Sequence, residues 1–216
     1  MKKQKTNQKP GIVLFDFDGT LSAGDANVGF WKYCFRNSLR PWLFLPVIFF
    51  GILLQIMAWI IRICFVRHIS HLSCLDIFWR EMLRPYLTPV MIKKLAAGFI
   101  KEFKQNRFGW AAEQVAKERA AGNFVILASA SPEYLLMPLV KDMKFDLIIC
   151  SEIDPVRPWK FKFFNYGENK VRSLNTIMGN RPNIIRAYSD SKSDLPMMRL
   201  AKEQVWIHPQ TGCRKN

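Results

Sequence analysis

An apolar segment that ends in two carboxylates constrains this chain more than any other feature. Residues 12–15 read Ile-Val-Leu-Phe, and the next six residues read Asp-Phe-Asp-Gly-Thr-Leu. Side chains alternate along a strand, so Asp16 and Asp18 are expected to point the same way. At the carboxyl end of a parallel strand they would share one crevice. This favours a phosphoryl-transfer site in which one carboxylate attacks phosphorus and the other handles a proton.

A second apolar segment follows the same plan. Residues 124–128 predict a strand that ends at Ser129, and Glu133 to Met143 predict a helix. Pro132 suits the first helical turn, and Ser131 suits the N-cap. A hydroxyl beside the free N–H groups of a helix start is suited to binding an anion.

Two further segments carry a cation and a second acidic pair. Residues 167–171 read Gly-Glu-Asn-Lys-Val and predict a helix start with Lys170 in its first turn. Residues 184–188 predict a strand, which Asp190 and Asp194 follow. Strands that alternate with helices predict an α/β fold with a right-handed, mostly parallel sheet.

The order of these four segments resembles the haloacid dehalogenase (HAD) superfamily of phosphatases. The resemblance covers residues 10–24 and 110–210, and its details A-S-A-S-P-E, Y-G-E-N-K-V and Y-S-D-S-K-S-D-L-P-M resemble subfamily IB. That subfamily includes phosphoserine phosphatases and the membrane-associated phosphatidylglycerophosphatase C type. The resemblance implies a Rossmann-like HAD core at residues 1–24 and 110–216 and a helical C1-type cap at residues 25–109.

The resemblance also implies catalytic roles. Asp16 would be the nucleophile that forms an aspartyl-phosphate, and Asp18 the general acid and then the general base. Thr20, Ser129 and Lys170 would bind the substrate phosphate, with Thr20 also orienting the carboxylates. Phosphoryl transfer needs mostly positioning and charge neutralisation, which suits this set.

A magnesium ion is the cofactor that the resemblance implies. Its ligands would be the Asp16 carboxylate, the Asp18 backbone carbonyl and Asp190, with Asp194 in support. Mg²⁺ is a hard ion that prefers a few carboxylates together with phosphate and water. Acids gathered this closely would repel one another without a cation.

Several assignments have alternatives. Ser131 competes with Ser129 for the phosphate, and we favour Ser129 because it lies nearest the strand end. Lys170 is favoured over other lysines because it follows Gly-Glu-Asn at a helix start. Those other lysines are Lys160, Lys162 and Lys192.

Asp25 has two interpretations. Phosphoserine phosphatases carry a substrate-contacting Glu nine residues after the nucleophile, and this chain has Asp there. The same residue equally suits an N-cap before Ala26. The acidic segment after the last strand also departs from its relatives, since it reads Ser-Asp-Ser where many have Gly-Asp-Gly.

Charge and cysteine content limit the binding partners and the cell compartment that we expect for this protein. The net charge is +15, yet the basic residues are dispersed without a nucleic-acid-binding signature, so we expect no nucleic acid partner. Lys2, Lys3, Lys5 and Lys9 form a basic start that anionic lipid would attract, or else a disordered tail. The five cysteines include no C-x2-C pair, and no signal peptide precedes residue 12, which indicates a reducing, cytoplasm-facing compartment. His68, His71 and Cys74 are spaced as metal ligands or as one helical face.

The predicted cap contains a long apolar segment. Residues 42–61 include one clearly polar residue, Gln55, and about 20 apolar residues can span a bilayer. A single crossing would separate Asp16 from Ser129 and Lys170, and the segment is too short for two crossings. Three arrangements of the segment remain: a helix that lies in the membrane plane, a re-entrant hairpin, or a helix buried in the cap. Arginines at both ends of the segment favour the first two.

Together with the resemblance, these observations predict a Mg²⁺-dependent phosphomonoesterase on the cytoplasmic face of a membrane, such as a bacterial inner membrane. The substrate that the resemblance to the phosphatidylglycerophosphatase C type favours is a phosphorylated lipid head group such as phosphatidylglycerophosphate. The alternatives are a cytoplasmic phosphatase of a soluble metabolite, similar to phosphoserine phosphatase, and a non-catalytic membrane adaptor. An intact set of site residues argues against the adaptor.

Overall fold

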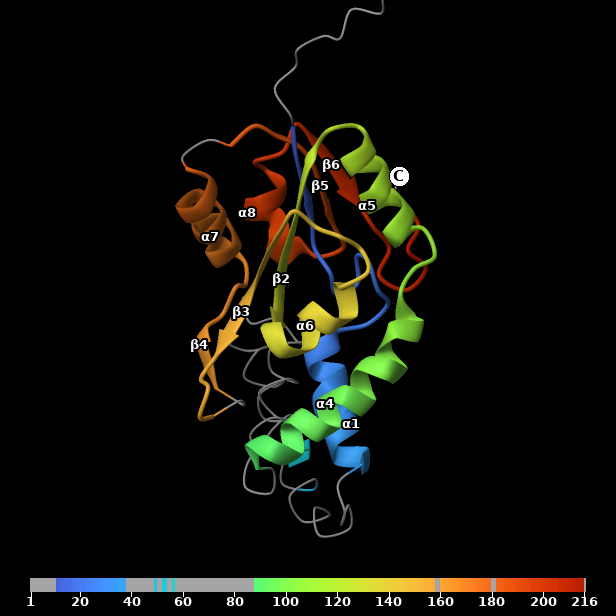
Figure 1. The fold of residues 1–216 in the computed structure, drawn as a ribbon, viewed down its shortest axis with the longest axis vertical. Helices are drawn as coiled ribbons and strands as arrows, with labels where there is room; N and C mark the ends of the chain where they lie inside the picture. The colour runs from blue at the N-terminus through green and yellow to red at the C-terminus, as the bar shows by residue number, and fades with distance from the viewer. Residues whose placement is uncertain are drawn as a thin grey trace, which may run out of the picture. The chain divides into compact units, whose positions relative to one another are not determined.

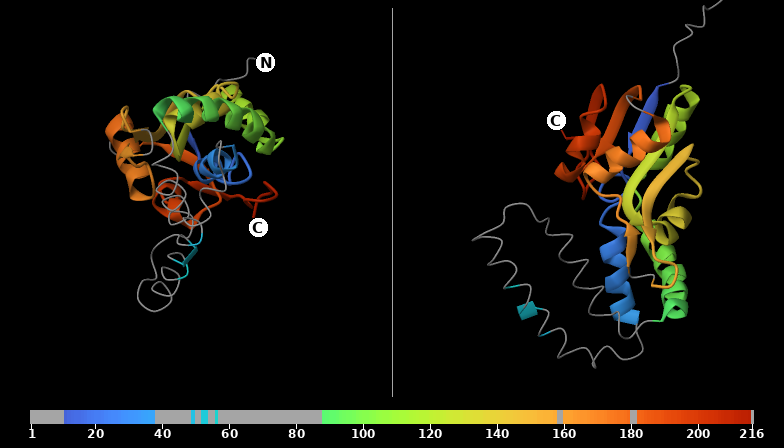
Figure 2. Two further views of the ribbon diagram at one scale, coloured as in Figure 1. Left: turned by 90° about the horizontal axis from the view of Figure 1, so that it is seen from below. Right: turned by 90° about the vertical axis from the view of Figure 1, so that its left-hand side faces the viewer.

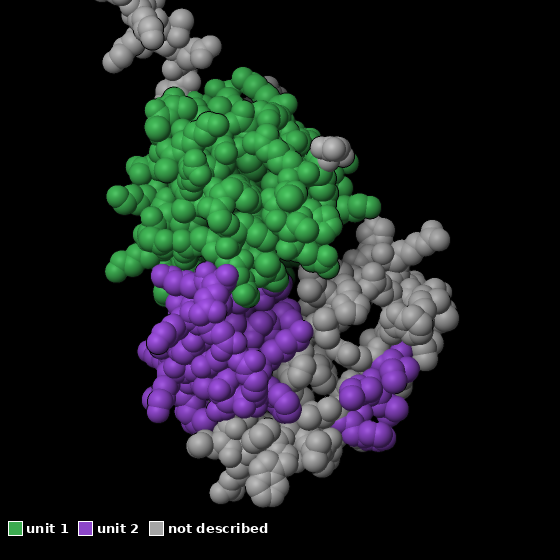
Figure 3. All heavy atoms as spheres, turned by 90° about the vertical axis from the view of Figure 1, so that its right-hand side faces the viewer, with its two compact units in different colours: residues 1–24, 106–152, 163–216 green, residues 25–105, 153–162 purple. Residues whose placement is uncertain are grey.

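The computed structural model describes residues 11–37, 49, 52–53, 56, 88–157, 160–179 and 182–215. The chain forms two compact units, drawn in green and purple in Figure 3. Unit 1 comprises residues 1–24, 106–152 and 163–216, and unit 2 comprises residues 25–105 and 153–162. Residues 153–162 thus group with unit 2, although the sequence analysis assigned them to the core. The assignment of one part of the chain as catalytic core and the other as cap stays a prediction.

One six-stranded sheet dominates the fold (Figure 1). The strands lie in the order β4-β3-β2-β1-β5-β6, and β1 pairs in parallel with both β2 and β5. The β2–β3 and β5–β6 pairs are parallel as well, which confirms the predicted α/β class with a mostly parallel sheet. In chain order the strands are β1 (Ile12–Phe15), β2 (Phe124–Pro132), β3 (Leu147–Ile153), β4 (Phe161–Phe163), β5 (Ile184–Ser189) and β6 (Glu203–Trp206).

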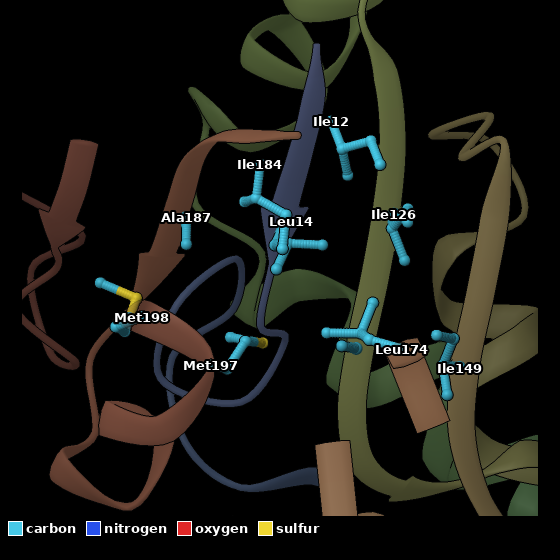
Figure 4. Close-up of a cluster of buried hydrophobic side chains, with 10 residues drawn as sticks. Ile12, Leu14, Ile126, Ile149, Leu174, Ile184, Ala187, Met197 and Met198 are labelled. Carbon is cyan, nitrogen blue, oxygen red and sulfur yellow. The ribbon is translucent and has the colours of Figure 1, made fainter. Parts of the chain in front are cut away.

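Helices cover both faces of the sheet, as Figure 1 and the two views in Figure 2 show. On one face, Ile12 and Leu14 of β1 pack with Leu174 of α7 (Glu168–Met178) and with Met197 and Met198 of α8 (Leu195–Met198), shown in Figure 4. Each such side chain contributes about 1.5–3 kcal/mol when fully buried.

The other face carries α5 (Ala111–Ala120) and α6 (Glu133–Val140), which both contact β2. Phe15 stacks on Tyr188 with ring centroids 4.3 Å apart, and the Tyr188 hydroxyl donates to Glu118 of α5 at 3.1 Å. Helix α5 ends at Ala120, and Gly122 follows with a φ of 83°, a backbone conformation that does not continue the helix. Helix α6 ends at Val140, three residues before the predicted end at Met143, because a turn begins there.

Unit 2 contains two packed helices, α1 (Ala26–Asn37) and α4 (Pro89–Phe103). The short helix η3 (Lys104–Asn106) follows α4 where the chain passes from unit 2 into unit 1. Phe99 of α4 meets Phe30 of α1 with ring centroids 5.6 Å apart. A Cβ at Gly98 would lie 2.4 Å from the Tyr33 hydroxyl, so the missing side chain permits this close approach. Thr88 caps α4 and Pro89 begins it, as expected at a helix start.

Most of the apolar segment 42–61 lies outside the described residues, as do the N-terminal lysines and the run from His68 to Cys74. Four residues within the segment are described, and all four are helical, apolar and between 47% and 71% exposed. They are Phe49, Ile52, Leu53 and Ile56. In the part of the chain that the structure describes, no helix combines the length and apolarity needed to cross a bilayer.

The C-terminal residues fold back onto the end of β6. Ile207 pairs antiparallel with Arg214, and the backbone N–H of Lys215 donates to the Trp206 carbonyl at 2.7 Å. Gly212 has a φ of 70°, and a Cβ there would lie 2.6 Å from the Phe108 ring. A residue without a side chain is therefore required at this turn.

Candidate functional site

The predicted site residues gather at the carboxyl edge of three neighbouring strands. Phe15, at the end of β1, pairs with Leu127 of β2 and with Tyr188 of β5. Because the three strands are parallel, the residues that follow them meet at one edge of the sheet. The strand order thus brings Asp16, Ser129 and Asp190 together from three separate parts of the chain.

A buried ion-pair cluster lies at the centre of the site. Lys170 Nζ is 2.7 Å from Asp16 Oδ1 and 2.8 Å from Asp194 Oδ1, and all three side chains are almost fully buried. Burial raises the pKa of Asp16 to about 7, against the opposing effect of Lys170. Burial also disfavours the Lys170 charge, but Asp16 and Asp194 outweigh it and raise the pKa of Lys170. The sequence analysis assigned Asp194 to metal support, and the structure pairs it with Lys170.

Thr20 links two of the acids. Its Oγ1 lies 3.3 Å from Asp16 Oδ2 and 3.2 Å from Asp190 Oδ1, and it accepts a hydrogen bond from the Asp190 N–H at 3.0 Å. One hydroxyl proton can serve only one of the two carboxylates. Burial, with a smaller contribution from Asp194, raises the pKa of Asp190.

Gly19 allows Asp190 to come this close. Its φ is 73°, and a Cβ there would lie 2.4 Å from Asp190 Oδ2. Both the backbone conformation and the lack of space therefore require glycine.

The two serines of β2 are arranged differently from the prediction. Ser131 was expected to cap the following helix, but β2 continues to Pro132, which is itself the N-cap of α6 and makes no side-chain cap bond. The Ser131 hydroxyl instead donates to Asp18 Oδ2 at 2.6 Å. Ser129 Oγ lies 3.5 Å from the same oxygen and accepts the Ser131 N–H at 3.0 Å. The helix-cap interpretation of Ser131 is therefore wrong, because the strand extends past it.

Asp25 lies in unit 2 and accepts a hydrogen bond from the Val28 N–H at 2.8 Å, which is the geometry of an N-cap for α1. Of the alternative lysines, Lys192 begins η4 (Lys192–Asp194), and the Lys160 backbone bonds to Asp154 and Arg157 in unit 2. The ammonium group that contacts Asp16 is that of Lys170.

Several residues that support the site were not predicted from the sequence. Ser189 donates to Asp194 Oδ2 at 2.7 Å, and Lys215 Nζ donates to the Asp190 carbonyl at 3.1 Å. Asn165 and Ser151, both fully buried, bond to the backbone of Ser129 and Ala130. Ser189 could have been recognised from its place directly before Asp190. Nothing local in the sequence marks the other three.

The oxygen atoms at this edge suit a hard divalent cation. Asp16 and Asp190 both approach the single proton of Thr20, so a cation would neutralise carboxylates that the hydroxyl cannot satisfy together. Within the described ranges, no three Asp, Glu, His or Cys side chains are grouped as a metal site. Asp16 and Asp190 are the carboxylates that could hold such an ion. Mg²⁺ is commonly bound through one or two carboxylates, with water and phosphate completing its shell.

The chain is similar to several known proteins. Protein CicA of Caulobacter vibrioides is 26% identical over 202 residues, which cover 91% of this chain and 85% of that protein. A probable phosphatase of Mycobacterium tuberculosis is 26% identical over 114 residues, covering 50% of this chain and 40% of that protein. A substrate-bound phosphoserine phosphatase structure superposes with a TM-score of 0.57 at 14% identity, covering 93% of this chain and 87% of the other.

A family model that matches most of the chain identifies the family. The model of the haloacid dehalogenase-like hydrolases matches residues 13–199, which include every site residue described above except Lys215. The predicted enzyme class, a hydrolase of phosphoric monoesters, agrees with this family and with the phosphatases among its relatives. The chain belongs to the haloacid dehalogenase-like hydrolases.

Proposed function

We propose that this protein is a Mg²⁺-dependent phosphomonoesterase that works through an aspartyl-phosphate on Asp16. The observation that supports this most directly is the buried pairing of Asp16 with Lys170, with Asp18 two residues along the chain. A buried carboxylate beside a buried ammonium group is suited to receiving a phosphoryl group whose charge the ammonium neutralises. Asp18 is only partly buried, which suits a group that exchanges protons with substrate and water.

The reaction has two balanced steps. An Asp16 oxygen attacks phosphorus, the bond from phosphorus to the leaving oxygen breaks, and Asp18 gives its proton to that oxygen. Asp18 then takes a proton from water, whose oxygen attacks the phosphorus of the aspartyl-phosphate. The bond to Asp16 breaks, inorganic phosphate leaves, and both carboxyl groups return to their starting state.

The remaining residues bind and orient the substrate. Ser129 would hydrogen-bond the phosphoryl oxygens, Lys170 would balance their charge, and Thr20 would hold Asp16 and Asp190 in register. Mg²⁺, held by Asp16, Asp190 and the Asp18 carbonyl, would supply further charge neutralisation when bound.

The proposed substrate is a phosphorylated lipid head group such as phosphatidylglycerophosphate, met at a membrane surface. Phe49, Ile52, Leu53 and Ile56 are spaced as one face of a helix, and all four are exposed. Together with the apolar segment 42–61 and the net charge of +15, they suit an anionic bilayer. Attachment would bring the enzyme to a substrate that stays in the membrane.

A soluble phosphomonoester is the second candidate. It is favoured by the phosphoserine phosphatase structure, whose fold matches over 93% of this chain. The apolar segment would then act only as an anchor or as part of the cap.

Phosphate release with Mg²⁺ separates these candidates. Wild type and Asp16→Asn are compared on phosphatidylglycerophosphate in mixed micelles, on phosphoserine and on an aryl phosphate. Glu113→Gln, an exposed carboxylate on α5, is the matched control and should retain full activity. Lipid turnover that disappears in Asp16→Asn supports the proposal, and turnover of the soluble esters alone selects the second candidate. Equal activity in wild type and Asp16→Asn would overturn the nucleophile assignment.

Flotation with anionic vesicles tests the membrane surface. Replacing the four exposed apolar residues with serine should release the protein from vesicles that wild type binds. Retained binding would place the attachment elsewhere.

A further inference from the structure

A short hydrogen bond joins Ser131 of β2 to the carboxylate of Asp18, and the roles proposed above give Ser131 no part in the reaction. The Ser131 hydroxyl donates to Asp18 Oδ2 at 2.6 Å, while the Ser129 hydroxyl lies 3.5 Å from the same oxygen. A bond from a hydroxyl to a carboxylate at this length is a strong one. Ser131 is 1% exposed, so water does not compete for its proton.

Ser131 lies within an irregularity of β2. Ala128 pairs with Ile149 and Pro132 pairs with Ser151, so three residues of β2 stand opposite one residue of β3. Such bulges change the direction of a side chain and free backbone groups from the sheet. Here the bulge comprises Ser129, Ala130 and Ser131, and it leaves the carbonyls of Ser129 and Ala130 in need of partners other than β3.

Two buried side chains supply those partners. Asn165 Nδ2 donates to the Ser129 carbonyl at 3.1 Å and to the Ile149 carbonyl at 3.2 Å. The Ser151 hydroxyl donates to the Ala130 carbonyl at 2.6 Å and accepts the Asn165 N–H at 2.9 Å. Asn165 and Ser151 are both fully buried.

Asn165 is itself held in one orientation. Ser173 of α7 donates to Asn165 Oδ1 at 3.1 Å, which leaves the amide nitrogen to face the two carbonyls. A buried polar network whose members all have partners is rigid, since any rotation would leave a buried group unsatisfied. Three polar side chains therefore hold the bulge of β2 in place, namely Asn165, Ser151 and Ser173.

We propose that Ser131 is a positioning residue for Asp18, with Ser151 and Asn165 as its support. The Ser131 hydroxyl holds the Asp18 carboxyl in the rotamer that faces the leaving oxygen. Without it, Asp18 samples other orientations and delivers its proton less often. This inference rests on the proposed function, because it assigns Ser131 a part in the proton transfer that Asp18 performs there.

The dependence of rate on the leaving group tests this role. A nitrophenyl phosphate has a leaving oxygen that needs little protonation, whereas an alkyl phosphate depends on the general acid. For Ser131→Ala, kcat/KM should fall roughly 10- to 100-fold with the alkyl phosphate and less than about 3-fold with the nitrophenyl phosphate. Ser131→Cys keeps the size but donates weakly, so it should behave like Ser131→Ala. Ser151→Ala should show a smaller loss with the same dependence.

Two comparison variants make the result specific. Ser129→Ala, on the same strand, should lower kcat/KM for both esters by the same factor, because its proposed contact is with the phosphoryl group that both share. Thr176→Ala removes an exposed hydroxyl of α7 that bonds to the Arg172 carbonyl at 2.9 Å, and it should change neither ester. A loss of folded protein alone would lower both rates equally and leave their ratio unchanged.

The outcomes separate this inference from the proposed function. If wild type hydrolyses both esters and Asp16→Asn neither, but Ser131→Ala loses both rates equally, then the positioning role is wrong and the proposed chemistry remains. Full activity of Ser131→Ala on the alkyl ester would overturn the role as well. If Asp16→Asn is as active as wild type, the proposed chemistry fails and the positioning role fails with it.

Discussion

Lys170 Nζ lies 2.7 Å from Asp16 Oδ1, although 154 residues separate the two in the chain. Asp194 Oδ1 completes the cluster at 2.8 Å from the same ammonium nitrogen. The pairing joins the end of β1 to the start of α7. The pairing therefore links two distant parts of the fold, and it also holds the carboxylate of the proposed nucleophile, Asp16, in place.

Removing the Lys170 charge should harm both properties. Lys170→Met keeps the length of the side chain but leaves two buried carboxylates without their cation. We expect the free energy of unfolding to fall by about 3–5 kcal/mol and phosphatase activity to be lost. Urea unfolding and phosphate release measure the two effects. Lys192→Met, at the alternative lysine of η4, should change stability little, and a larger effect there than at Lys170 would contradict the assignment.

Two glycines with positive φ provide a matched pair. Gly19 and Gly24 have φ of 73° and 82°, but a Cβ at Gly19 meets Asp190 at 2.4 Å whereas one at Gly24 meets nothing within 4 Å. Alanine at either position should cost about 1–2 kcal/mol in backbone strain. Only Gly19→Ala should also displace Asp190, weaken Mg²⁺ binding and lower kcat roughly 100-fold. Calorimetric titration with Mg²⁺ would contradict this if both variants bound it alike.

Glu118 should contribute stability that depends on pH. Burial opposes its ionisation, but hydrogen bonds and charge from Arg186, with Asn123 and Gln114, hold the pKa of Glu118 below its ordinary value. A carboxyl group with a lowered folded pKa stabilises the protein above its unfolded pKa, about 4.3, and this contribution is lost as the pH falls through the folded pKa. Glu118→Gln should therefore cost roughly 1–3 kcal/mol at pH 7 and progressively less below pH 4.3.

Urea unfolding from pH 7 downward measures this difference. Glu113→Gln, on the exposed side of the same helix, is the control and should change stability little at any pH. A difference between wild type and Glu118→Gln that stays constant with pH would mean that the charge of Glu118 is not the stabilising feature.

Asp25 distinguishes a helix cap from a substrate contact. Its carboxylate accepts the Val28 N–H, and asparagine caps helices about as well as aspartate. Asp25→Asn should therefore leave stability and KM unchanged, and Asp25→Ala should cost about 1 kcal/mol of stability. Thermal unfolding and steady-state kinetics provide the measurements. A KM that rises in Asp25→Asn at unchanged stability would restore the substrate-contacting interpretation.

The sequence by itself determined the three strands that lead into the site, the parallel class of the sheet and the four segments that reach the site. Those properties follow from local patterns: an apolar run before Asp16, another before Ser129, and a glycine before the helix that carries Lys170. Parallel strands with helical connections bring their carboxyl ends to one edge, so the gathering of these segments follows from the pattern.

Only the tertiary structure decided how the side chains are partnered there. Strand β2 continues past Ser131, whose hydroxyl donates to Asp18 instead of capping the helix, and Asp194 is a partner of Lys170. Asn165 and Lys215 reach the site from segments whose sequence carries no signal for it. Such contacts depend on strand register and on side-chain direction across long separations in the chain. A shift of strand register by one residue turns each side chain to the other face of the sheet, and local sequence patterns do not specify such long-range pairings.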